Sequence, residues 1–346
     1  MPGNLDLVAL GNPLLDMQIR NGESVLEKYN LKANDAILAE ESHMPIYSHI
    51  VENFDVVYVA GGAAQNAARC AQYILPGNST VYLGCVGKDD LAEQLRKANE
   101  KEGLKSCYQV VESEPTGSCA VVITGHNRSL VTRLGAAEKF SPSHLATAEV
   151  QKLVEGAKMF YLGGFFLTHG IESALIIAKA ASKQGVPFTM NLSAPFIPQF
   201  FKDQVDQVLP YASVVVGNES EFEAYAASHS LADPKDLKAI AQHIADLPAT
   251  FGSLQQKRYV VCTNGAQPTI LAVQGESSQK EIPTAQVPDS EIVDTNGAGD
   301  AFAGGVLGAL LLGKTIEQAV EVGQKLGRMC IGQVGPMLKF PKEQIV

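Results

Sequence analysis

Short apolar strands that end in glycine and lead into helical stretches recur along this chain, and this pattern limits its fold more than any other feature. Such runs are typical of buried strands, and the glycine lets the chain turn sharply into the following helix. Strands that alternate with helices in this way form a mostly parallel sheet with helices on both faces. The expected strands cover residues 5–10, 56–60, 81–85, 159–162, 188–192, 214–216 and 259–263, and helices are expected at 63–75, 172–183 and 301–312.

Two segments interrupt this alternation and predict a second, smaller domain. Residues 14–58 hold short strand-like pieces and polar helix candidates near 23–30 and 41–53. Residues 107–135 have a strand–turn–strand pattern, and the polar turn residues at 125–128 favour a hairpin. We expect these two segments to form one small β-rich lid. The large α/β domain is expected to consist of residues 1–13, 59–106 and 136–346.

The overall charge and the distribution of apolar residues exclude several classes of partner. With a net charge of −10 and no Lys/Arg cluster, the chain lacks the basic face of a nucleic-acid binder. Its longest apolar run, around residues 306–312, is far too short to span a bilayer. The first residues do not resemble a signal peptide, and the six scattered cysteines are typical of reduced thiols. We therefore expect a cytoplasmic protein, with nuclear presence left open, and a monomer, because the lid offers no obvious edge for pairing.

The segment from Asp294 to Asp300 carries the strongest chemical signal in the sequence. Gly297 and Gly299 let the backbone approach a ligand closely, and an apolar helix follows directly. The free N–H groups and the dipole of a helix N-terminus form a binding site for an anion such as phosphate. A carboxylate at Asp300 would repel that anion, but it is well placed as a base that accepts a proton from an attacking hydroxyl. The alternative is an ordinary turn in which Thr295 and Asp300 cap the helix.

Residues 308–315 match the Walker A phosphate-binding pattern letter for letter, but we reject that function for them. A P-loop follows a strand and opens a helix, whereas these residues continue an apolar helix. Gly313 stands where a glycine ends a helix, and Thr315 followed by Gln318 predicts a capping box that starts the next helix.

Residues 294–300 resemble the second signature of the ribokinase-like (PfkB) family of carbohydrate and nucleoside kinases. The resemblance extends along essentially the whole chain and points to the members that phosphorylate adenosine. It implies a ribokinase-like fold, with both substrates bound to the large domain under the lid. It also implies transfer of the γ-phosphate of ATP to the 5′-hydroxyl of adenosine, with Mg²⁺ as the cofactor. The further motifs, in the order of the family, are residues 11–16, 34–40, 60–66, 115–119, 127–130, 164–168, 191–196 and 217–219.

The resemblance implies roles for individual residues. Asp16 follows the first strand, and a carboxylate there can accept hydrogen bonds from both hydroxyls of a ribose. The catalytic residues implied are Asp300 as the base, the backbone at Gly297, Ala298 and Gly299 as an anion hole, and Arg128 on the transferring phosphate. The other substrate-binding residues implied are Asn12, Leu14, Leu38, Gly61, Gly62, Ala63, Asn66, Cys119, Leu130, Phe166 and Phe196. The ATP-binding residues implied are Asn191, Asn218, Thr263, Gly265, Asn296, Gly297 and Gly299, and Glu221 is implied to organise Mg²⁺ through water.

Other functions remain open at this point. A kinase acting on free ribose or fructose is the main alternative within the family. The apolar residues Phe166 and Phe196 favour a nucleoside instead, since a free sugar requires more polar walls. Ala36 and the pair Ala63–Ala64 stand where the family often has polar residues, so they weaken the preference for one particular base. A catalytically silent nucleoside-binding protein is disfavoured by Asp300 and the two glycines. A dinucleotide-dependent oxidoreductase is disfavoured because no Gly-x-Gly-x-x-Gly follows the first strand.

Overall fold

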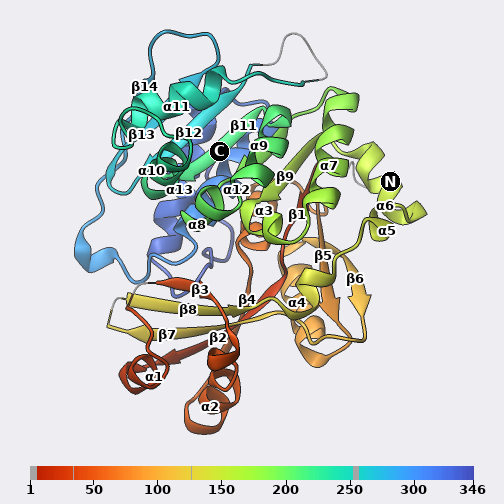
Figure 1. Ribbon diagram of the computed structural model, residues 1–346, viewed down its shortest axis with the longest axis vertical. Helices are drawn as coiled ribbons and strands as arrows, with labels where there is room; N and C mark the ends of the chain where they lie inside the picture. Colours follow the sequence, from red (N-terminus) through yellow and green to blue (C-terminus); the bar gives the residue numbers. More distant parts are fainter. Residues whose placement is uncertain (1–5, 34, 126, 252–256) are drawn as a thin grey trace.

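A large, mostly parallel sheet forms the centre of the protein, as the alternating pattern predicts (Figure 1). This computed structural model describes residues 6–33, 35–125, 127–251 and 257–346. Within that part of the chain the sheet has nine strands, in the order β14-β13-β12-β11-β10-β9-β1-β5-β6, and only β13 and β14 are antiparallel to their neighbours. The strands are β1 (Leu7–Leu10), β5 (Thr80–Gly87), β6 (Lys105–Val111), β9 (Met159–Gly163), β10 (Phe188–Asn191), β11 (Val214–Asn218), β12 (Tyr259–Asn264), β13 (Gln267–Val273) and β14 (Lys280–Ile282).

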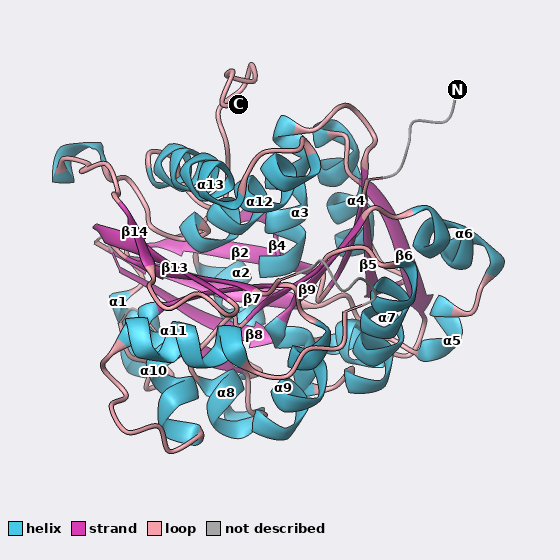
Figure 2. Cartoon of the chain, turned by 90° about the horizontal axis from the view of Figure 1, so that it is seen from above, coloured by secondary structure: helices cyan, strands magenta, loops and turns pink. Residues whose placement is uncertain are grey.

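Helices pack against both faces of this sheet because its central strands are apolar on both sides (Figure 2). In β1, Val8 and Leu10 join one buried cluster, whereas Leu7 and Ala9 join the cluster on the opposite face. One face is covered by α3 (Ala63–Ile74), α4 (Asp90–Glu102), α12 (Ala298–Leu311) and α13 (Ile316–Ile331). The other is covered by α5 (Pro142–Leu145), α6 (Ala148–Gly156), α7 (Ile171–Gln184), α8 (Phe196–Phe200), α9 (Lys202–Val208), α10 (Glu219–Ser228) and α11 (Leu237–Asp246).

A second sheet forms the small, lid-like part of the molecule. Its described strands lie in the order β3-β8-β7-β2-β4, and they are β2 (Leu14–Arg20), β3 (Ala36–Leu38), β4 (Val57–Gly61), β7 (Ser118–Thr124) and β8 (Asn127–Arg133). Two helices, α1 (Glu23–Lys28) and α2 (Ile46–Asn53), bury their apolar residues against one side of this sheet. Short 3₁₀ helices cover Glu41–His43, Gly135–Lys139, Gly164–Thr168, Leu209–Tyr211 and Asp289–Glu291.

The structure differs from the predicted division at two strands. We expected residues 56–60 in the parallel sheet, but β4 is an edge strand of the small sheet and pairs antiparallel with β2. We expected residues from 107 onward in the small domain, but β6 pairs in parallel with β5 in the large sheet. A short apolar run forms a strand in either sheet, and its partner depends on contacts that are distant in the sequence.

The helix predicted at 301–312 begins earlier than expected, at Ala298, so that Asp300 lies in its first turn. The rejected P-loop is indeed part of a helix: residues 308–311 end α12, and Gly313 follows with a positive φ of 79°. Thr315 and Gln318 form the predicted capping box of α13. Leu5 and His126, which we placed in a strand and a turn, lie outside the described residues. No helix among the described residues is long and apolar enough to cross a bilayer.

Candidate active site

A cavity of about 400 Å³ lies between the carboxyl ends of the large sheet's strands and the small sheet. It is lined by residues that are up to nearly three hundred positions apart in the sequence, such as Asp16 and Asp300. A parallel α/β sheet binds ligands at this edge. The predicted site residues that line this cavity are Asn12, Leu14, Asp16, Leu38, Gly62, Ala63, Asn66, Cys119, Leu130, Phe166, Asn191, Phe196, Asn218, Glu221, Thr263, Asn296, Gly297, Gly299 and Asp300.

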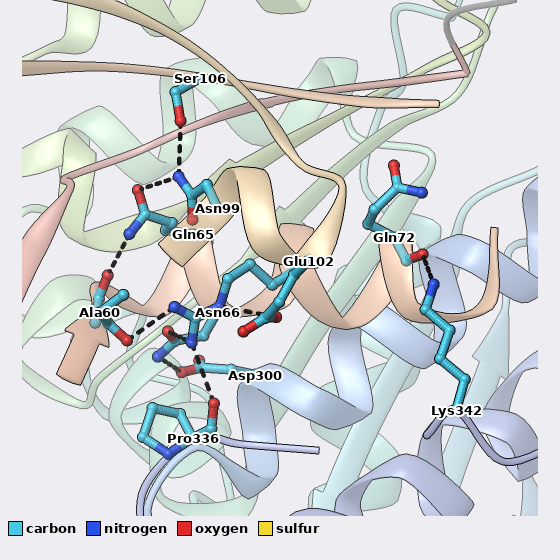
Figure 3. Close-up of polar contacts among 12 residues, drawn as sticks. Ala60, Gln65, Asn66, Gln72, Asn99, Glu102, Ser106, Asp300, Pro336 and Lys342 are labelled. Atoms are coloured by element: carbon cyan, nitrogen blue, oxygen red, sulfur yellow. Dashed lines mark hydrogen bonds and ion pairs between the residues drawn. The ribbon is translucent and has the colours of Figure 1, made fainter. Parts of the chain in front are cut away.

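Asp300 lies in the first turn of α12, and its carboxylate faces helix α3. The Nδ2 of Asn66 donates a hydrogen bond of 2.9 Å to the Oδ2 of Asp300 (Figure 3). Burial raises the pKa of Asp300 to about 7, although this hydrogen bond and the charge of Arg69 lower it. A carboxylate with such a pKa is well suited to accept a proton near neutral pH.

The residues just before Asp300 form the helix N-terminus that the glycines predict. Gly297 is the N-cap and has a positive φ of 78°, a conformation that side chains rarely adopt. Among the described residues, the N–H groups of Gly297 and Gly299 have no hydrogen-bond partner, so they are available to an anion. Ala298 differs from the prediction, because its N–H donates to the carbonyl of Thr295 at 3.3 Å and it does not line the cavity.

Asp16 lies on β2 and its side chain is buried at the wall of the cavity. Burial raises the pKa of Asp16 to about 7, partly offset by the charge of Arg69. Gly61 does not line the cavity, but a Cβ on it would lie 2.3 Å from the Oδ1 of Asp16. Gly62 has a φ of 87°, and a Cβ on it would clash with the carbonyl of Asn12. Both glycines therefore let the turn before α3 lie directly against the residues expected to bind the sugar.

Apolar side chains from the small sheet and from the large domain form the remaining walls on the side of the lid. Leu38 and Leu130 come from the small sheet, and Phe196 comes from the large domain. The ring of Phe196 lies 5.9 Å from that of Phe165, which the prediction did not include. Phe166, which it did include, has no exposed surface and packs against His169. Flat apolar walls of this kind suit an aromatic base.

Several of the residues predicted for ATP and metal lie at or just after the ends of β10, β11 and β12, whereas Asn296, Gly297 and Gly299 lie around the start of α12. Asn218 and Glu221 form a capping box at the start of α10, in which each side chain accepts a hydrogen bond from the other's backbone N–H. Burial raises the pKa of Glu221 to about 8. Thr263 donates to the carbonyl of Gly217 at 3.3 Å, and Gly265, in contrast, does not line the cavity.

Arg128 does not lie in a turn, because it belongs to strand β8. Its side chain is buried and its Nη2 forms an ion pair with the Oδ2 of Asp294, the first residue of the catalytic segment. Arg128 is not among the cavity-lining residues, and its Nη1 has no hydrogen-bond partner among the described residues. The contact nevertheless joins the small sheet to the segment that begins α12.

The sequence reasoning missed part of the lining. Most of the missed residues are glycine or apolar residues, which carry no chemical signal of their own. The polar ones, Thr132, Thr168, Ser193 and Thr295, are too common in loops and strands to be singled out. The cavity is also lined by Gly11, Ile37, Leu134, Gly163, Phe165, Val216, Gly217 and Phe302, and by Ala36 and Ala64, which we expected near the substrate.

Comparison with known proteins confirms the family resemblance and the ribokinase-like fold. Residues 25–343 match the model of the pfkB family of carbohydrate kinases. An adenosine kinase of Schizophyllum commune is 52% identical over 341 residues, which cover 98% of each chain. The crystal structure of Anopheles gambiae adenosine kinase in complex with P1,P4-di(adenosine-5) tetraphosphate has a TM-score of 0.90 and 42% identity, covering 94% of this chain and 95% of that one. Schistosoma mansoni adenosine kinase in complex with adenosine, in an occluded loop conformation, has a TM-score of 0.90 and 36% identity, covering 96% of each chain. The chain therefore belongs to the pfkB family of carbohydrate kinases, alongside these adenosine kinases.

Proposed function

We propose that this protein transfers the γ-phosphate of ATP to the 5′-hydroxyl of adenosine, giving AMP and ADP. The observation that carries the proposal is the position of Asp300, a half-buried carboxylate that lines the cavity in the first turn of α12, beside the unpaired N–H groups of Gly297 and Gly299. Asp300 accepts the proton of the attacking hydroxyl. The two N–H groups and the helix dipole stabilise the negative charge on the transferred phosphoryl group.

The opposite wall of the cavity suits the sugar and base of a nucleoside. The carboxylate of Asp16 accepts hydrogen bonds from the two ribose hydroxyls, and the amide of Asn66 lies between the sugar and Asp300. Leu38, Leu130 and Phe196 enclose the base between apolar surfaces. A free sugar would leave these surfaces in contact with water, so the shape and chemistry of the cavity favour a nucleoside.

The proposal includes Mg²⁺ bound with ATP, and the chemistry of Glu221 fits such a site. Among the described residues, no group of three or more His, Cys, Asp or Glu side chains could hold a metal ion by itself. Glu221 is a buried carboxylate that lines the cavity, and the nearby charges of Glu219 and Asp300 both disfavour its ionised form. A divalent cation that keeps its waters would offset that repulsion, so Glu221 and Asn218 would hold the hydrated ion. The ion would neutralise negative charge on the phosphates of ATP.

The acceptor is tested by measuring ADP release with Mg-ATP across adenosine, other purine and pyrimidine nucleosides, ribose and fructose. We expect adenosine to have the highest kcat/KM, because a nucleoside uses both the Asp16 wall and the apolar walls, whereas a free sugar uses only the Asp16 wall, and the relatives of this chain are adenosine kinases. Turnover with ribose or fructose but not with nucleosides would contradict the adenosine assignment. Binding of adenosine without any ADP release would instead indicate a silent nucleoside-binding protein.

We also predict that Arg128→Met lowers kcat by about 10- to 100-fold, the range that corresponds to one lost charged hydrogen bond. Arg128 holds Asp294, the first residue of the segment that leads into α12, so its loss releases that segment from the small sheet. We expect the KM for adenosine to change less than kcat, because Arg128 does not line the cavity. The matched control is Arg133→Met, on the same strand, whose side chain lies over the ring of Tyr47. A larger effect on KM than on kcat would place Arg128 in the nucleoside site.

A further inference from the structure

Arg69 is a buried cation close to the proposed base, and the reaction described above gives it no role. It lies on α3, one turn after Asn66, and is 4% exposed. Its Nη1 donates to the carbonyl of Ala60 at 2.9 Å, and its Nη2 donates to the Oδ1 of Asn66 at 3.0 Å and to the carbonyl of Pro336 at 3.2 Å. Its Nε lies 3.5 Å from the Oε2 of Glu102. The guanidinium is therefore fixed by groups from β4, α3, α4 and the C-terminal segment.

The contact with Asn66 determines which end of the Asn66 carboxamide faces Asp300. Arginine only donates hydrogen bonds, and an ionised carboxylate only accepts them. Because Arg69 holds the Oδ1 of Asn66, the Nδ2 points the other way and donates to Asp300 at 2.9 Å (Figure 3). If the Asn66 amide were reversed, its NH₂ group would face the N–H groups of Arg69, and its oxygen would face the carboxylate of Asp300. The chain Arg69–Asn66–Asp300 thus has one favourable arrangement.

We propose that Arg69 is a positioning residue for phosphoryl transfer, which holds the Asn66 amide in the orientation that fixes the Asp300 carboxylate. The proposal rests on the proposed function, because it takes Asp300 as the base. Arg69 does not line the cavity, so it acts through Asn66 and through its charge and does not touch the substrates. A carboxylate displaced by about 1 Å from the attacking hydroxyl loses about 100-fold in rate, which sets the scale of the expected effect.

The charge of Arg69 also acts on the carboxylates of Asp16 and Asp300. It lowers the pKa of Asp300 and is the largest influence that lowers the pKa of Asp16, although burial holds both at about 7. Loss of this charge therefore raises both pKa values. The other titratable or charged groups that interact with Asp300 or Asp16 are Cys70, Tyr82, Cys119, Arg128, Tyr161, Glu221 and Cys330, and Glu102 faces Arg69 itself.

The test compares Arg69→Met, Arg69→Lys and the wild-type protein by steady-state kinetics from pH 5.5 to 9. We expect Arg69→Met to lower kcat by about 100-fold, to change the KM for adenosine less, and to move the acid limb of the kcat profile to higher pH. Arg69→Lys keeps a positive, donor-only group, so we expect its kcat to stay within about tenfold of wild type and its acid limb to stay in place. A purely structural role of Arg69 would lower the amount of folded enzyme without moving the limb.

The matched control is Lys342→Met. Lys342 is a second basic residue that ties the C-terminal segment to α3, through a 3.0 Å hydrogen bond to the carbonyl of Gln72 (Figure 3). It has no contact with Asn66 or Asp300 among the described residues. We expect its loss to leave kcat and the pH profile unchanged, which separates loosening of this segment from misorientation of Asn66.

If Arg69→Met does not fold, Arg69→Lys is measured with and without Asn66→Ala. If Arg69 acts through Asn66, the effect of Arg69→Lys on kcat disappears once the Asn66 amide is absent. Equal effects of Arg69→Lys in the wild-type and Asn66→Ala proteins would overturn the proposal. An unchanged kcat and pH profile in folded Arg69→Met would overturn it as well. Failure of the proposed function is a different result, since the wild-type protein would then not phosphorylate adenosine. If another acceptor is phosphorylated, the same comparison is made with that acceptor.

Discussion

Replacing Asp300 by asparagine is expected to lower kcat for adenosine phosphorylation by about 10³- to 10⁴-fold, the upper part of the range for general acid–base catalysis. The amide keeps the size and most of the hydrogen-bonding surface of the carboxyl group, but it does not accept a proton. The binding of adenosine depends on Asp16 and the apolar walls, so we expect its Kd to change little. Single-turnover rates and equilibrium binding of adenosine measure the two effects separately.

The stability of the same variant reports whether the pKa of Asp300 is raised in the folded protein. A carboxyl group whose pKa rises from 3.8 to about 7 on folding destabilises the native state as the pH rises between those values. Asparagine carries no charge, so Asp300→Asn should raise Tm at pH 8 and change it much less at pH 4.

The kinetic prediction for Asp300→Asn has its own contrary outcome. If this variant phosphorylated adenosine as fast as wild type, another group would accept the proton.

Replacing Gly297 by alanine is expected to lower kcat by about 10²- to 10³-fold, the effect of losing one donor of an oxyanion hole. Gly297 has a φ of 78°, and a Cβ on it would lie 2.4 Å from the Cβ of Pro336. The backbone must therefore move, and the N–H groups at the start of α12 move with it. The rate at saturating ATP and adenosine is the quantity to measure.

The matched control is Gly313→Ala, which introduces the same backbone strain outside the site. Gly313 has a φ of 79°, and a Cβ there would meet nothing within 4 Å. We expect it to cost about 1 kcal/mol of stability without changing kcat. Equal losses of kcat in the two variants would show that general destabilisation, and not the position of the N–H groups, explains the effect.

The sequence predicts those parts of the site that are fixed by local conformation. Gly297 and Asp300 are predictable together, because a helix N-terminus with a left-handed glycine is a local structure with a recognisable sequence. The rejection of the Walker A match has the same basis, since Gly313 and Thr315 end one helix and start the next. The large parallel sheet also follows from local patterns, repeated along the chain.

Features that depend on distant contacts could not be predicted in this way. The sequence does not show that β4 pairs with β2, because the glycines after β4 are equally consistent with a strand of the large sheet. It does not distinguish Phe165 from Phe166, because the residues that surround each ring in the folded protein decide which one packs against Phe196. Arg128 was predicted to lie in a turn, and Arg69 was given no role. A buried arginine has no local sequence signature, so its position becomes clear only when its partners are known.

The order of the strands has a consequence for synthesis of the protein on the ribosome. Every strand of the small sheet, β2, β3, β4, β7 and β8, lies before residue 134. The central strand β1 of the large sheet, by contrast, pairs on one side with β9, and α3 packs on α12 near the end of the chain. Since domains fold as the chain emerges, the nascent chain can complete the lid while the apolar face of α3 is still uncovered. The carboxylates of Asp16 and Asp300 therefore come together only after α12 has been synthesised.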